Sequence, residues 1–285
     1  MTASNNTPRT WMITGAARGI GLRIVEVALA AGDRVVATSR DVGALRERFA
    51  GNAALLPVAL DVTDEKQAGA AVATALAHFG HIDVLVNNAG FGLLGAVEEA
   101  SADEVRRLYE TNVFGLLNVT RAVLPAMRER RSGHVINISS VGGLRSGPGF
   151  GVYCSTKFAV EGLSEALHAE LAPLGVHVTV IEPGYFRTEF LDGTSLTVSP
   201  RILADYAPTS GKTREAAVRI NLNQPGDPKR LAQAVLALVA SATPPLRPPL
   251  GTDTLQAIAE RNSYAATETA AWRELSASTD FPAGE

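Results

Sequence analysis

The chain has 285 residues, of which 46% are hydrophobic, with a formal net charge of −3 and a single cysteine, Cys154. This composition supports a sizeable core, gives no basic footprint for nucleic acid or an anionic membrane, and excludes an intrachain disulfide. No apolar run approaches the roughly 18 residues of a membrane span, and the N-terminal residues lack the pattern of a secretory signal. We therefore expect a cytoplasmic protein, folded as one domain over residues 1–285, that acts on small molecules.

Short β-branched runs alternate with longer helical patterns along the chain. Strand candidates begin at Trp11, Val35, Leu55, Ile82, His134 and Val176, and helices are expected at 19–31, 64–79, 101–130 and 151–173. Continuous runs of Val, Ile and Leu are typical of strands that are buried on both faces. The pattern predicts an α/β fold with one doubly wound parallel sheet of the Rossmann type and helices on both faces.

Two segments depart from this alternation. Residues 190–225 are rich in Ser, Thr and Pro and predict a lid insertion after the sixth strand, with a helix near 212–222; a surface decoration is the alternative. Asp227 and Pro228 then mark the start of another helix. Residues 253–285 are expected to form a C-terminal extension with a helix and a loosely packed end.

The first strand candidate leads into T-G-A-A-R-G-I-G, residues 14–21, which opens a helix. Glycines at 15, 19 and 21 would let the backbone approach a pyrophosphate, and the helix N-terminus offers free N–H groups. A tight turn is the alternative for glycines alone. Their position in a βα repeat favours a dinucleotide site.

The end of the second strand indicates which dinucleotide fits. Ser39 stands where a carboxylate would bond the ribose 2′-hydroxyl, and Arg40 follows it. Arg18 could supply a second guanidinium to a 2′-phosphate. These residues favour NADP (NADPH) over NAD; two solvated arginines are the alternative. Asp61, after the third strand, could accept from the adenine amino group or cap the next helix, although Asp64 is the better cap.

A second group of residues points to proton transfer. Tyr153 and Lys157 lie at i and i+4, so they share a helical face on which the cation could lower the pKa of the phenol. Ser140 precedes the tyrosine by 13 positions. Asn112 interrupts an apolar helical line and could either hold an ordered water beside the lysine or bond to nearby backbone.

Together these motifs resemble the short-chain dehydrogenase/reductase family. The resemblance spans about residues 9–250 and rests on T-G-x-x-x-G-x-G, N-N-A-G, Asn112, Ser140, Y-x-x-x-K and P-G-Y-F-R-T in this order and spacing. It is closest to single-domain members similar to steroid dehydrogenases. It implies an NADP-dependent oxidoreductase that transfers hydride between nicotinamide and a ketone or aldehyde, or a secondary alcohol.

The resemblance also implies a role for each matching residue. Tyr153 would donate the proton, Lys157 would lower its pKa and bind the nicotinamide ribose, Ser140 would hold the substrate oxygen, and Asn112 would complete a water relay. The cofactor site implied by the resemblance comprises Gly15, Ala17, Arg18, Gly19, Ile20, Gly21, Ser39, Arg40, Asp61, Val62, Asn87, Ala89, Gly90, Tyr153, Lys157, Pro183, Gly184, Phe186 and Thr188.

The remaining expectations concern the substrate and partners. Leu144, Phe150, Tyr185 and Leu191 flank the serine, the tyrosine and the lid, so we expect them beside a mainly apolar substrate. No metal is expected, because the five histidines lack metal-ligand spacing. The resemblance implies a homodimer or homotetramer formed by the helices at 101–130 and 151–173. A non-catalytic NADPH-binding sensor or regulatory protein is the alternative function.

Overall fold

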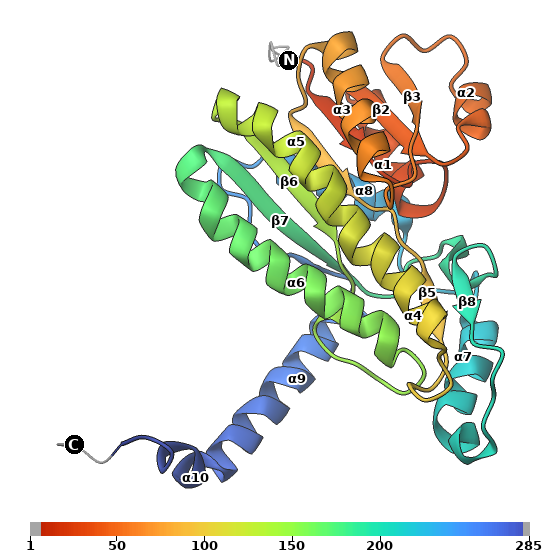
Figure 1. The fold of residues 1–285 in the computed structure, drawn as a ribbon, viewed down its shortest axis with the longest axis vertical. Coiled ribbons are helices and arrows are strands. Elements are labelled where there is room, and N and C mark those ends of the chain that lie inside the picture. Colours follow the sequence, from red (N-terminus) through yellow and green to blue (C-terminus); the bar gives the residue numbers. More distant parts are fainter. Residues whose placement is uncertain (1–6, 282–285) are drawn as a thin grey trace.

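A seven-stranded sheet forms the centre of the computed structural model, which describes residues 7–281 (Figure 1). The strand order is β3-β2-β1-β4-β6-β7-β9, and each neighbouring pair is parallel. The strands are β1 (Thr10–Ile13), β2 (Arg34–Ser39), β3 (Leu55–Ala59), β4 (Val84–Asn87), β6 (Gly133–Ile138), β7 (Val176–Pro183) and β9 (Pro249–Leu250). The doubly wound parallel sheet is thus confirmed. The two-residue β9 was not predicted, because prolines surround it and it is too short to show a pattern.

Helices cover both faces of the sheet and bury the side chains that alternate along its strands. The covering helices are α1 (Gly19–Ala30), α2 (Gly43–Arg48), α3 (Glu65–Phe79), α5 (Leu116–Arg130), α6 (Gly151–Leu171) and α8 (Pro228–Ala240). Trp11 and Ile13 of β1 pack with α1, α2 and α8, whereas Met12 points to the other face and packs with α3, α5 and α6. This period of two is what a strand buried on both faces requires.

Two predicted helix starts are confirmed in detail. Asp64 caps α3 and accepts from the backbone N–H groups of Lys66 and Gln67. Asp227 caps α8 by accepting from the N–H of Lys229, with Pro228 in the first turn. Both caps satisfy N–H groups that have no partner within the helix.

The single helix expected at 101–130 is interrupted. It consists of α4 (Ala102–Tyr109), a π-helical segment (Glu110–Gly115) and α5. A π-helical turn accommodates one extra residue and is common at functional sites. The interruption contains Asn112, which turns inward and bonds to the backbone of Phe91.

Residues 190–225 lie outside the main sheet. They contain β8 (Leu196–Val198), which pairs in parallel with β5 (Gly92–Leu94), and α7 (Lys212–Ile220), close to the helix expected at 212–222. The C-terminal helices α9 (Thr252–Ala271) and α10 (Arg273–Ala277) project from the body (Figure 1). Thr254 and Ala257, in the first turns of α9, are buried.

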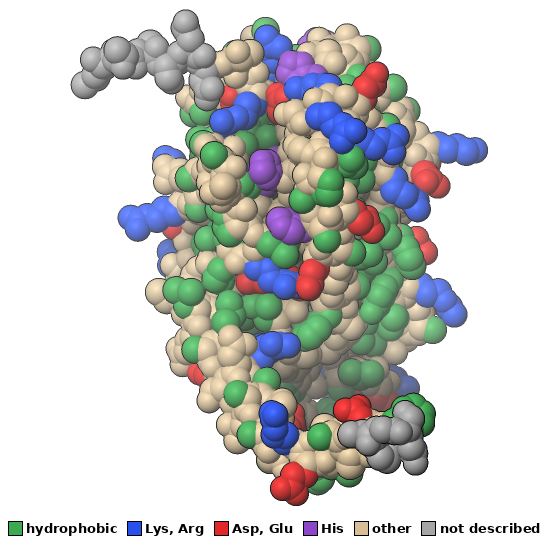
Figure 2. All heavy atoms as spheres, turned by 90° about the vertical axis from the view of Figure 1, so that its left-hand side faces the viewer, with side chains coloured by type: hydrophobic (Ala, Val, Ile, Leu, Met, Phe, Trp, Pro, Cys, Tyr) green, Lys and Arg blue, Asp and Glu red, His purple; other side chains and the backbone are tan. Residues whose placement is uncertain are grey.

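The surface carries charges of both signs. Figure 2 shows acidic and basic side chains interspersed with hydrophobic ones over one face of the molecule. Between residues 7 and 281, no helix combines the length and the apolar character that crossing a membrane requires.

Candidate active site

A deep cleft opens at the carboxyl ends of the parallel strands. It has a volume of about 1420 Å³ and extends from Ser39 and Arg40, past the glycine loop, to Tyr153 and Lys157. The cleft includes the region where β1 lies between β2 and β4, so that successive strands are added in opposite directions. Open α/β sheets bind their ligands at such a switch point.

The glycine loop has the shape that a phosphate group needs. Gly15 and Gly19 have φ angles of +62° and +55°, in the left-handed region that favours glycine, and α1 begins at Gly19. Free N–H groups and the positive end of the α1 dipole therefore face the cleft. Ala17, Arg18 and Ile20 line it as predicted, so these residues fit a dinucleotide. Gly21 is buried behind the loop, where an added Cβ would lie 2.5 Å from Asn88 Nδ2.

Among the described residues, Asn87 is not part of the cleft lining, although it was predicted to contact the cofactor. Its amide is buried and donates to Thr120 Oγ1 at 2.8 Å and to Asn137 Oδ1 at 2.9 Å, which ties β4 to α5 and β6. Asn88 lines the cleft instead, and it donates to the carbonyl oxygens of Thr14 and Gly15. Successive side chains point to opposite sides of an extended chain. The sequence alone does not show which of the two adjacent asparagines points into the cleft.

The far end of the cleft holds the residues expected to select the cofactor. Ser39 and Arg40 line it, and Asp61 and Val62 face it from the end of β3. Asp61 accepts from the N–H and hydroxyl of Thr63, so it shapes the local turn as well. Arg18 donates to the carbonyl oxygen of Thr194 at 2.6 Å. Its guanidinium thus contacts the 190–225 segment in this structure.

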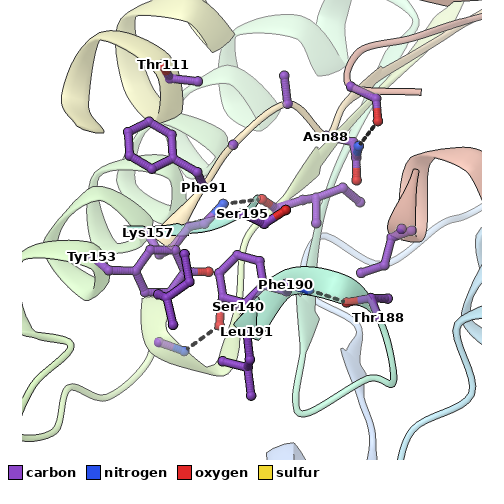
Figure 3. A pocket seen from close by; sticks show the side chains of 18 of the residues that line it. Asn88, Phe91, Thr111, Ser140, Tyr153, Lys157, Thr188, Phe190, Leu191 and Ser195 are labelled. Atoms are coloured by element: carbon purple, nitrogen blue, oxygen red, sulfur yellow. Dashed lines mark hydrogen bonds between the residues drawn. The ribbon is translucent and has the colours of Figure 1, made fainter. Parts of the chain in front are cut away.

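Ser140, Tyr153 and Lys157 converge at the other end of the cleft (Figure 3). Tyr153 lies in the first turn of α6, and its side chain points toward Ser140, which follows β6. Ser140 Oγ accepts from the N–H of Gly142 at 3.0 Å. Lys157 lies one turn further along α6 and donates to the carbonyl oxygen of Ile138 at 2.8 Å.

Burial dominates the acidity of these groups. It raises the pKa of the Tyr153 phenol above its ordinary value, and the neighbouring Ser140 hydroxyl opposes this effect. The net lowering expected from Lys157 is not found, because burial prevails and Lys157 Nζ lies 5.8 Å from the centre of the tyrosine ring, where it bonds to Ile138. Burial also lowers the pKa of Lys157 to about 8, while the charge of Glu161 acts in the opposite direction.

Asn112 lies beside this group but does not line the cleft within the described residues. Its two amide hydrogens are used by the carbonyl oxygen of Phe91 at 3.0 Å and by Thr156 Oγ1 at 3.2 Å, and its oxygen accepts from the N–H of Phe91. Of the two alternatives left by the sequence, this arrangement matches the amide bonded to nearby backbone. It leaves no amide hydrogen for a water molecule.

The walls around Tyr153 are apolar and aromatic. Phe150, Tyr185 and Leu191 line the cleft as predicted, and Ala89, Gly90, Pro183, Gly184, Phe186 and Thr188 complete the expected nicotinamide end. Among the described residues, Leu144 is not part of this lining. Sequence reasoning missed Phe91 and Phe190, although Phe190 packs against Tyr153 with ring centres 5.6 Å apart. Its place shortly after P-G-Y-F-R-T could have indicated it.

A buried ion pair fastens the 190–225 segment to the body. Glu99, whose side chain is fully buried, pairs with Arg214 of α7 at 2.7 Å and accepts from the backbone N–H groups of Ala96 and Leu203. The guanidinium of Arg214 and these hydrogen bonds hold the pKa of Glu99 at about 2. The carboxylate therefore keeps its charge at neutral pH, and the pair is lost only under strongly acidic conditions.

A dinucleotide-shaped cleft that ends in a serine, a tyrosine and a lysine defines a Rossmann-type oxidoreductase that uses a nicotinamide cofactor. The chain matches the family model described as short chain dehydrogenase over residues 9–197, and it belongs to this family. The resemblance found in the sequence is thus confirmed.

Several curated relatives match most of the chain. Oxidoreductase BOA17 of Botryotinia fuckeliana is 38% identical, over 94% of this chain and 98% of its own length. The 3-ketodihydrosphingosine reductase of Bacteroides thetaiotaomicron is 36% identical, over 86% and 88%. Human retinol dehydrogenase 8 is 36% identical, over 84% and 80%.

Solved structures agree with this assignment. A short-chain dehydrogenase from Streptomyces avermitilis is 41% identical, with a TM-score of 0.90 over 96% of this chain and 100% of its own. A family member from Burkholderia phymatum in complex with NAD gives a TM-score of 0.80 at 26% identity, over 92% of this chain and 95% of its own. A serine dehydrogenase complexed with NADP⁺ gives 0.72 at 29%, over 85% and 94%.

The ion pair predicts how firmly the segment is held. Replacing Arg214 by alanine leaves the Glu99 carboxylate buried without its guanidinium, which typically costs about 3 kcal/mol. We expect the amides of residues 196–220 to exchange hydrogen faster in Arg214→Ala, as measured by mass spectrometry. Arg219→Ala changes an exposed arginine of the same helix and serves as the matched control. Equal exchange in both variants would contradict this role of the Glu99–Arg214 pair.

Proposed function

We propose that this protein is an NADP-dependent oxidoreductase that interconverts a ketone or aldehyde with an alcohol, on a mainly apolar substrate. The observation that carries the proposal is the meeting of Ser140 and Tyr153 at the apolar end of a nucleotide-shaped cleft, with Lys157 one turn away on the same helix. A substrate oxygen placed between the two hydroxyls would lie against the aromatic wall of Phe150 and Phe190.

Each residue has a distinct part in this chemistry. The nicotinamide, when bound, supplies or accepts the hydride. Ser140 and Tyr153 hold the carbonyl oxygen, so their hydroxyl groups face the negative charge that grows on it during reduction. Tyr153 then releases its proton to that oxygen. Lys157, held by Ile138, places a cation behind the ring and stabilises the phenolate that remains.

The acidity of Tyr153 favours the reductive direction. Burial raises its pKa, so the phenol keeps its proton across the neutral range and stands ready as a donor. Proton transfer to a developing alkoxide is downhill, because an alkoxide is more basic than a phenolate. Oxidation of an alcohol requires the phenolate as base, and burial disfavours that form.

Apolar side chains around the reactive group support a lipid-like substrate. Phe91, Phe150 and Phe190 line the cleft and pack in one cluster with Tyr153, and Leu191 and Leu196 also line the cleft. Two of the relatives are named for the reduction of 3-ketodihydrosphingosine and for retinol, and both compounds are largely hydrocarbon. The substrate we infer is accordingly a hydrophobic ketone, aldehyde or alcohol.

The same reasoning assigns NADPH as the preferred cofactor. Ser39 lines the cleft where a carboxylate would repel a 2′-phosphate, and the exposed Arg40 beside it can bond to that phosphate. Arg18 lies in the glycine loop on the same cleft.

A pairing of this chain with copies of itself is also proposed. Phe114 and Phe158, in the π-helical segment and in α6, are 48% and 43% exposed, although large apolar side chains gain by burial. A second copy could cover both rings.

The catalytic assignment predicts how removal of the Tyr153 hydroxyl group changes kcat. In Tyr153→Phe, loss of the donor hydroxyl should lower kcat for carbonyl reduction by at least about 100-fold and leave NADPH affinity within about threefold. Tyr109→Phe removes a hydroxyl that bonds Ser155 and should leave kcat unchanged. NADPH oxidation is followed with a panel of hydrophobic ketones and aldehydes. Retained turnover in Tyr153→Phe would refute the assignment. Binding of NADPH by the natural protein without any turnover would favour the sensor.

The cofactor assignment is tested at Arg40. We expect kcat/KM to be higher with NADPH than with NADH, and Arg40→Ala to lower the NADPH value about tenfold while sparing NADH, since a bond to a charged phosphate is lost. Arg46→Ala, which alters a nearby exposed arginine of α2, is the control. A clear preference for NADH in the natural protein would overturn this part of the proposal.

The self-association is tested in solution. Sedimentation of the natural protein at micromolar concentration should show a dimer or tetramer. Phe158→Glu places a charge in the proposed contact and should yield monomer, whereas Val218→Glu changes a residue that is 80% exposed on α7 and should not. A monomeric natural protein would remove the proposal.

A further inference from the structure

A buried acidic cluster lies directly behind the catalytic lysine. Glu161 is one turn further along α6 and is 5% exposed. Its Oε2 accepts from Arg247 Nε at 3.0 Å. The loop that carries Ser140 packs against it, since a Cβ added to Gly143 would lie 3.0 Å from Glu161 Oε1 and 2.5 Å from Ser139 Oγ. Glu161 therefore contacts the part of the chain that positions the proposed catalytic serine.

The cluster contains more negative charge than its single cation can balance. Arg247 also binds Glu165 at 2.9 Å and lies 3.8 Å from Glu182 Oε1. Within residues 7–281, Glu161 Oε1, Glu182 Oε1 and Ser139 Oγ are buried without a hydrogen-bond partner. One guanidinium thus faces three carboxyl groups. Buried carboxylates that lack hydrogen-bond partners are costly unless another positive charge lies nearby.

Lys157 is the nearby cation that this excess of carboxyl groups can stabilise. The lysine is 8% exposed, and its ammonium bonds to the Ile138 carbonyl. Because burial brings the pKa of Lys157 to about 8, not far above neutral pH, a nearby charge can decide whether the side chain is protonated. The field of Glu161 favours the ammonium form.

The following proposal about Glu161 rests on the proposed function. We propose that Glu161 is a positioning residue that keeps Lys157 protonated during catalysis, and that Arg247 and Glu182 hold the negative charge on Glu161.

The groups around Glu161 support this division of roles. The charged and titratable groups that face it are Lys157 and Glu165 on α6, Glu182 on β7, and Arg247 before β9. Burial, followed by the charge of Glu161, raises the pKa of Glu182 to about 7. Below that pH Glu182 takes up a proton, which reduces the repulsion between the two carboxyl groups and leaves Arg247 bonded to Glu161.

The chain offers a direct measurement of the lysine. It contains four lysines, Lys66, Lys157, Lys212 and Lys229, and three of them are exposed. In protein labelled with ¹³C at the lysine Cε, the Lys157 signal is identified by its loss in Lys157→Met. We expect its titration midpoint to fall by about one pH unit in Glu161→Gln, because a nearby opposite charge is removed. Glu165→Gln, which changes an exposed carboxylate on the same arginine, is the control and should leave the midpoint in place.

Catalysis should follow the same shift. Carbonyl reduction needs the ammonium form of Lys157, so kcat/KM is expected to fall as the pH rises through its pKa. In Glu161→Gln this fall should begin about one pH unit lower, giving about a tenfold loss relative to the natural protein at alkaline pH and little loss below pH ~6.5. Glu161→Asp keeps the charge and should restore the natural profile.

The outcomes separate this inference from the proposed function. An unchanged Lys157 midpoint in Glu161→Gln overturns the inference, whether or not the enzyme turns over. A uniform loss of activity at all pH values, with no displacement of the profile, indicates a merely structural role and also overturns it. A displaced midpoint in a protein that reduces no carbonyl would refute the proposed function while the action of Glu161 on the lysine stands.

Discussion

A buried ammonium group organises this site, because Lys157 has little solvent and must be held by the protein itself. The Ile138 carbonyl at the end of β6 accepts from it at 2.8 Å, and Glu161 supplies a compensating charge. These contacts tie α6 to the end of β6, and Tyr153 stands one turn earlier on the same helix. The accommodation of one buried cation thus helps to hold the phenol near Ser140, which follows β6.

The parallel sheet brings the two halves of the site together. Strand ends that are far apart in sequence meet at one edge, so the glycine loop after β1 and Ser140 after β6 face the same cleft. The sheet supplies rigidity, and the 190–225 segment supplies an apolar wall through Phe190 and Leu196. Since that segment is fastened by the Glu99–Arg214 pair, the wall keeps its place relative to Tyr153.

Sequence reasoning succeeded where a residue's role follows from local periodicity or chemistry. The βα alternation predicted the sheet and its covering helices, and the caps at Asp64 and Asp227 followed from local hydrogen bonding. It failed where the placement of a side chain depends on contacts between residues that are distant in the chain. The exchange of Asn87 for Asn88 and the π-helical break at Asn112 depend on neighbours distant in sequence. The acidity of Tyr153 was misjudged because spacing shows that a cation is near but not how deeply the phenol is buried.

The C-terminal extension consists of two unlike parts. Asp253, at the start of α9, accepts from the backbone N–H of Tyr185 at 2.6 Å and lines the cleft, while the residues after Ala257 leave the body and are largely exposed. The first turn therefore acts as a buttress for the loop beneath the substrate end. The root of the helix is thus coupled to the cleft at two points, the Asp253 hydrogen bond and the ion pair between Glu260 and the cleft residue Arg145, whereas the exposed turns further out can vary in length or composition with less effect on the site.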